Sequence, residues 1–108
     1  MNFRHVAALT LVVWYLMLPP ATNTLVFNPS APLSEWHIND TYYTPSECEE
    51  DCTHVRERAA QRLQNSPARW PERDIAKAMN VLFGNAQCIR SDDPRLTKKQ
   101  RESAEHND

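Results

Sequence analysis

The feature that most constrains this chain is an apolar run that two prolines end. Val6–Leu18 contains a single polar residue, Arg4 precedes it, and Pro19 and Pro20 follow it directly. A charged start, an apolar run of about 7–15 residues and a break are typical of a secretory signal. As a helix the run would extend about 20 Å, less than the roughly 30 Å of a bilayer core. We therefore expect residues 1–21 to be a signal peptide or an uncleaved N-terminal anchor, with a buried core segment as the third interpretation.

Either of the first two interpretations places the remainder of the chain outside the cytoplasm, because the charged start stays inside. The sequence thus predicts an exported protein, periplasmic or extracellular, that meets a membrane only through residues 6–18. The part that follows is small, and small domains have marginal cores that commonly need a staple. Its three cysteines, Cys48, Cys52 and Cys88, offer one, because an oxidising compartment favours disulfides.

Geometry narrows the pairing of these cysteines without deciding it. Cys48 and Cys52 stand four residues apart on an expected helix, where side chains project in parallel and a disulfide is strained. Cys88 should therefore close onto one of them and leave the other as a spare thiol. The cysteines lack a usual zinc-ligand spacing, and His54 would point away from Cys52 on the helix. We expect no metal.

Local patterns predict the first half of the folded part. The proline-rich residues 22–35 are expected to form an extended connector, and residues 36–43 alternate as a short half-buried strand does. The segment Thr44-Pro-Ser-Glu47 is a capping box with proline at the first helical position. A helix should therefore run from Pro45 to about Gln64.

The second half contains another helix, a short strand and a polar end. Residues 71–83 carry a helical apolar stripe, and Gly84 stands where a left-handed residue would end the helix. Residues 86–90 are expected to be a strand, and residues 92–108 a disordered polar tail. The fold class is therefore α+β: a small domain over residues 36–91, with two helices packed on a short sheet of two or three strands.

Composition excludes several functions. The 14 acidic and 12 basic residues nearly balance, which argues against electrostatic nucleic-acid binding. The single glycine argues against a glycine-rich phosphate loop. The four histidines are scattered, and the carboxylates of residues 47–51 are explained by the dipole of the helix that starts there. We expect no catalytic residue and no cofactor, and hence not an enzyme. Asn39 lies in a glycosylation sequon whose use the sequence does not decide.

Several fragments resemble a family of small, uncharacterised exported bacterial proteins. That family has a W-Y-L-M-x-P-P segment, a helix opening with a Cys-Glu pair, and an ending of the form C-I-x-[ST]-D-D-P-R-L. The matching fragments here are residues 14–20, 32–36, 43–49 and 86–96. The resemblance implies export and no activity.

The resemblance also points to Cys48 and Cys88 as the two equivalent cysteines, with Cys52 additional. It therefore implies a Cys48–Cys88 disulfide and a buried free thiol at Cys52. Independently of the resemblance, we expect the strand at residues 86–90 to lie against the strand at residues 36–43, which also favours Cys48 as the partner of Cys88. For function, we expect a non-enzymatic envelope or interaction module with an unidentified envelope or extracellular partner. The alternative is a thiol-redox or metal-binding protein that uses the odd cysteine.

Overall fold

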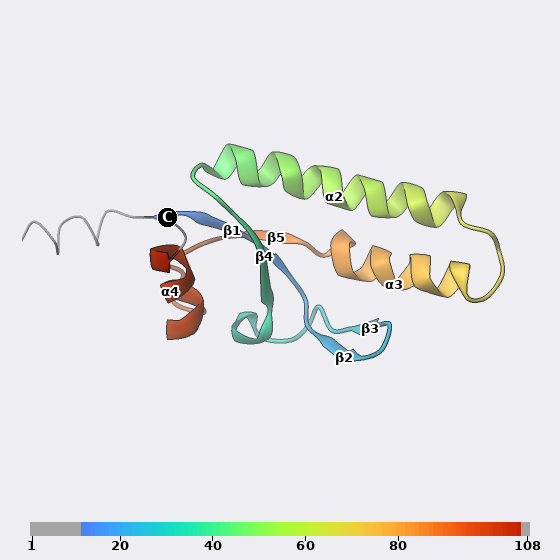
Figure 1. The fold of residues 1–108 in the computed structure, drawn as a ribbon, viewed down its shortest axis with the longest axis horizontal. Helices are drawn as coiled ribbons and strands as arrows, with labels where there is room; N and C mark the ends of the chain where they lie inside the picture. Colours follow the sequence, from blue (N-terminus) through green and yellow to red (C-terminus); the bar gives the residue numbers. More distant parts are fainter. Residues whose placement is uncertain (1–11, 107–108) are drawn as a thin grey trace, which may run out of the picture.

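The structure, a computed structural model, describes residues 12–106 and confirms the α+β class. Within that range a three-stranded sheet, a two-stranded sheet and three α-helices form one body (Figure 1). The elements, in chain order, are β1 (Trp14–Leu18), β2 (Ala21–Asn23), β3 (Val26–Phe27), the 3-10 turn η1 (Leu33–Glu35), β4 (His37–Tyr42), α2 (Pro45–Asn65), α3 (Glu72–Gly84), β5 (Gln87–Arg90) and α4 (Lys98–His106).

Strand β1 is the centre of the larger sheet, which has the order β4-β1-β5 with both pairs antiparallel. Successive side chains of a strand point to opposite faces. Tyr15 and Met17 lie on the face that α4 and η1 cover, and Leu16 and Leu18 lie on the face that α2 covers. Figure 1 shows α2 along one side of the sheet and α4 and η1 along the other. Both faces of β1 are covered, which is why its sequence is apolar throughout.

The position of β1 corrects the expected boundary of the N-terminal segment. Residues 14–18 are not part of a removable leader or of a helical anchor, because they are a buried strand between two partners. A cut after Ala21 would remove the centre of the sheet, so the third interpretation, a buried core segment, holds for this part of the run. A short, continuous apolar run has the same sequence pattern in a buried strand as in a helix, so the pattern alone did not separate the two. Residues 1–11 lie outside the described part, and none of the helices in residues 12–106 is long and apolar enough to cross a membrane.

Helix α2 begins as its capping box predicts. The backbone N–H of Glu47 donates to Thr44 Oγ1 at 3.2 Å, and Pro45 takes the first helical position. In a standard capping box the glutamate side chain accepts from the backbone N–H of the cap residue. Here the Thr44 hydroxyl, and not its N–H, donates to Glu47 Oε1, at 2.9 Å. The helix ends at Asn65, one residue beyond the expected end.

Helix α3 also forms where predicted, but its C-terminus is built differently. Gly84 does not adopt a positive φ, and Asn85 follows it with φ of −104°. The expected left-handed ending is therefore wrong. Asn85 Nδ2 donates to Val81 O at 2.7 Å, and the N–H of Ala86 donates to Phe83 O at 3.2 Å. These two bonds satisfy carbonyls that a left-handed glycine would otherwise serve.

The expected connector, residues 22–35, contains more structure than an extended chain. Strands β2 and β3 pair as a hairpin whose turn includes Leu25 at φ of 62°. After η1 the indole of Trp36 is buried and donates to Ala31 O at 2.9 Å. The connector thereby supplies part of the core on the η1 face.

The segment expected as a disordered tail is folded as far as residue 106. Leu96 is buried against the sheet, and α4 follows it. The Tyr15 hydroxyl donates to Gln100 O at 2.9 Å, while Gln100 Nε2 donates to Leu33 O at 3.2 Å and Trp36 O at 3.1 Å. One leucine and one amide thus attach a polar segment that lacks an apolar stripe. Residues 107–108 lie outside the described part.

Candidate functional site

Two features of the folded chain are candidates for function, and the first is the cysteine cluster under α2. Cys48 and Cys88 form a disulfide with Cα atoms 6.0 Å apart. It joins the first turn of α2 to β5 across 40 residues of sequence. Cys48 is fully buried. The pairing that the resemblance implied is therefore present.

The neighbourhood of this disulfide differs from our expectation in one respect. Strand β5 does not lie against β4, because β1 separates them. Cys88 pairs in register with Leu16 of β1, and both residues pack in the cluster on the α2 face. Cys88 therefore reaches Cys48 from the far edge of the sheet, across the face that α2 covers.

Cys52 is a free thiol one helical turn beyond Cys48, and it is fully buried. Its Sγ donates to Ala86 O at 3.2 Å, and Arg56 Nη2 donates to the same carbonyl. Burial raises the pKa of the Cys52 thiol, and the nearby positive charge of Arg56 opposes the shift only in part. Since the thiolate is the nucleophile and the metal ligand, the folded protein keeps this sulfur in its unreactive form.

A possible metal-ligand set includes this thiol. The ligand atoms of Glu49, Cys52 and Cys88 lie within 4.8 Å of one another. The sulfur of Cys88 is bound to Cys48, however, and a disulfide sulfur does not supply the thiolate that zinc requires. The set therefore needs reduction of the disulfide before it offers three ligands. His54, which we did not expect to join it, is exposed on α2.

The polar residues of the D-D-P-R-L ending form a turn that positions Leu96 in the core. Asp93 accepts hydrogen bonds from the backbone N–H of Arg95 at 2.9 Å and from its guanidinium at 2.8 and 3.0 Å. The side-chain bonds, followed by the backbone bond, lower the pKa of Asp93 to about 2. The turn directs Leu96 into the core. Just before it, Ser91 Oγ accepts from the N–H of Val13 at 3.0 Å and so fixes the start of β1.

Tyr42 joins β4 to the start of α2. Its hydroxyl donates to Asp51 Oδ2 at 2.6 Å and to Asp40 Oδ2 at 3.3 Å. Burial, with the hydrogen bond to Asp51 next, raises the pKa of Tyr42 above its ordinary value. The raised pKa of Tyr42 therefore has a structural cause, because its hydroxyl attaches α2 to β4, an edge strand of the sheet.

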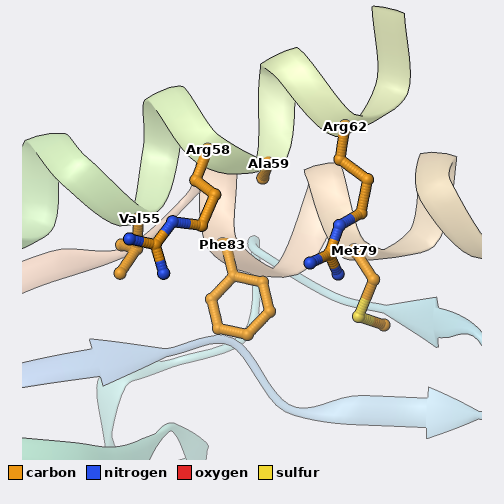
Figure 2. Close-up of a pocket in the computed structure, with 6 residues that line it drawn as sticks. All are labelled: Val55, Arg58, Ala59, Arg62, Met79 and Phe83. Carbon is orange, nitrogen blue, oxygen red and sulfur yellow. The ribbon is translucent and has the colours of Figure 1, made fainter. Parts of the chain in front are cut away.

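The second candidate is a hollow between α2 and α3 of about 210 Å³. Its apolar surface comes from both helices, and two arginines of α2 flank it (Figure 2). The lining residues are Val55, Arg58, Ala59, Arg62, Met79 and Phe83. These two arginines were not among the site residues expected from the sequence. Arg58 and Arg62 stand four residues apart, which places them on one face of α2, and that spacing is the signal that could have indicated this site.

No protein-family model, curated protein or solved structure matches this chain.

Proposed function

We propose that this chain is a small exported protein that acts as a non-enzymatic envelope or interaction module, periplasmic or extracellular. The observation that carries the proposal is the Cys48–Cys88 disulfide, built into the core by a fully buried cysteine. Disulfides persist in oxidising compartments and are rare in the cytosol. Membership of the exported bacterial family described above is part of the same proposal.

The chemistry of the described residues supports an interaction role. Strongly perturbed groups often belong to catalytic sites, but structural networks perturb pKa values too. Here burial and a hydrogen bond to α2 account for the raised pKa of Tyr42. The hydrogen bonds of a turn account for the lowered pKa of Asp93, and burial accounts for the raised pKa of Cys52. The hollow between α2 and α3 is the surface that we assign to binding.

The location is tested with the full chain fused at its C-terminus to a reporter that is active only outside the cytoplasm. We expect activity, and we expect it to be lost when Leu9→Arg interrupts the apolar run Val6–Leu18 ahead of strand β1. A fusion to a cytoplasm-active reporter controls for expression of both variants. An inactive export reporter beside an active cytoplasmic one contradicts the proposal.

A thiol-redox or metal-binding role is the second candidate, favoured by the proximity of Cys52, Cys88 and Glu49. It is separated from the first by counting free thiols and bound zinc on the purified exported protein. One unreactive thiol and no zinc support the interaction module. Three titratable thiols, or zinc in stoichiometric amount, support the second candidate.

A further inference from the structure

We infer that the hollow between α2 and α3 binds the carboxylate form of a single-chain amphiphile, a medium-chain fatty acid. The inference rests on the proposed interaction function and names the class of its ligand. The site combines an apolar floor with two cationic groups on one rim (Figure 2).

The apolar floor of the hollow has room for an alkyl chain but not for a larger ligand. Ala59 is buried, Val55, Met79 and Phe83 are half-buried, and each leaves apolar surface in the hollow. Its volume of about 210 Å³ is below the roughly 300–1,000 Å³ of pockets that take drug-sized molecules. Methionine adapts its shape readily to different apolar contacts. A flexible alkyl chain therefore fits the hollow better than a ring system does.

The rim selects the charge of the ligand. Arg58 and Arg62 lie one turn apart on the same face of α2, and Figure 2 shows both side chains extending beside Phe83 and Met79. Within residues 12–103, neither guanidinium has an ion-pair or hydrogen-bond partner. Like charges four residues apart on a helix repel each other. A carboxylate between them would relieve that repulsion and accept hydrogen bonds from both forks.

The test is a titration of the purified, disulfide-bonded full chain with hexanoate, octanoate and decanoate below their micelle-forming concentrations. Backbone amide NMR shifts report both the affinity and the place of binding. We expect shifts concentrated on α2 and α3, with affinity rising about fourfold per added methylene until the hollow is filled. Octanol, which has the chain without the charge, should bind at least about fivefold more weakly than octanoate.

Variants separate the rim from the floor. Arg58→Gln and Arg62→Gln should each weaken octanoate about fivefold and leave octanol unchanged. Met79→Gln should weaken both ligands, while Arg69→Gln, which removes a cation outside the hollow, should weaken neither. Circular dichroism and the intact disulfide verify the fold of each variant.

Equal affinity for octanol and octanoate overturns the inference, as do shifts located away from the two helices or an absence of binding. These results concern the purified protein, so they are independent of the export reporter. Export without fatty-acid binding refutes the ligand class alone, whereas a failed reporter refutes the location alone.

Discussion

The Cys48–Cys88 disulfide should account for a large share of the stability of this domain. It closes a loop across 40 residues of sequence, and a loop of that length restricts the unfolded chain by about 4 kcal/mol at room temperature. Domains of this size are stable by roughly 5–15 kcal/mol. Loss of the bond should therefore bring the protein close to the point at which it unfolds on mild heating.

The perturbation is best made in a Cys52→Ala background. Cys52 lies within 4.8 Å of the Cys88 sulfur, so in a Cys48→Ala protein it would offer a replacement bond and hide the effect. Cys52→Ala itself should cost only about 1 kcal/mol, the effect of a small cavity. Its hydrogen-bond acceptor, Ala86 O, keeps the bond from Arg56 and is not left unsatisfied.

Urea unfolding followed by circular dichroism measures each step. Cys48→Ala/Cys52→Ala should unfold about 4 kcal/mol more easily than Cys52→Ala, with a larger dependence on urea because the unfolded chain is less restricted. Chemical reduction of Cys52→Ala should give the same loss. A difference below about 1 kcal/mol, or a Cys52→Ala protein as unstable as the double variant, would refute the reasoning.

Three further predictions concern polar contacts. Thr44→Ala should lower stability by about 1 kcal/mol through the lost cap of α2, while Thr44→Ser should not, as thermal unfolding will show. Tyr42→Phe should cost about 1 kcal/mol in urea unfolding, because its hydroxyl donates to Asp51 at 2.6 Å. Arg95→Gln should raise the pKa of Asp93 from about 2 towards its ordinary value, followed by carboxyl NMR titration. Because the folded pKa of Asp93 is lowered, its stabilising contribution is present above about pH 4 and is lost as the pH falls through 2; the variant should lack this acid dependence, and an unchanged Asp93 titration would contradict the assignment.

Much of the fold was predictable because local chemistry decides it. The cap of α2 depends on four consecutive residues, 44–47, and it forms as the sequence indicates. The stripe of α3 and the short strand β5 are local patterns of the same kind. The Cys48–Cys88 pair was predicted through a resemblance, although the expected neighbour of β5 was wrong, since strand order is a long-range property.

The errors arise where long-range packing overrides a local pattern. Residues 14–18 are apolar on both sides because α2 covers one face and α4 with η1 cover the other, and neither cover is visible within the run itself. Residues 92–106 are polar in sequence, yet Leu96 and the amide of Gln100 attach them to partners more than 60 residues away. Such contacts exist only once the sheet has formed.

Several of the positions on which the family resemblance rests have structural tasks in this fold. Residues 14–18 form the central strand, Cys48 and Cys88 the staple, and residues 91–96 the turn that seats Leu96 in the core. A motif that the fold itself explains carries no information about a ligand. Function is then better sought in charged residues that the fold does not use. Arg58 and Arg62 meet that criterion, because within the described side chains they have no partner and flank an apolar hollow. Stability assays should therefore be nearly indifferent to Arg58→Gln and Arg62→Gln, while ligand titrations should not.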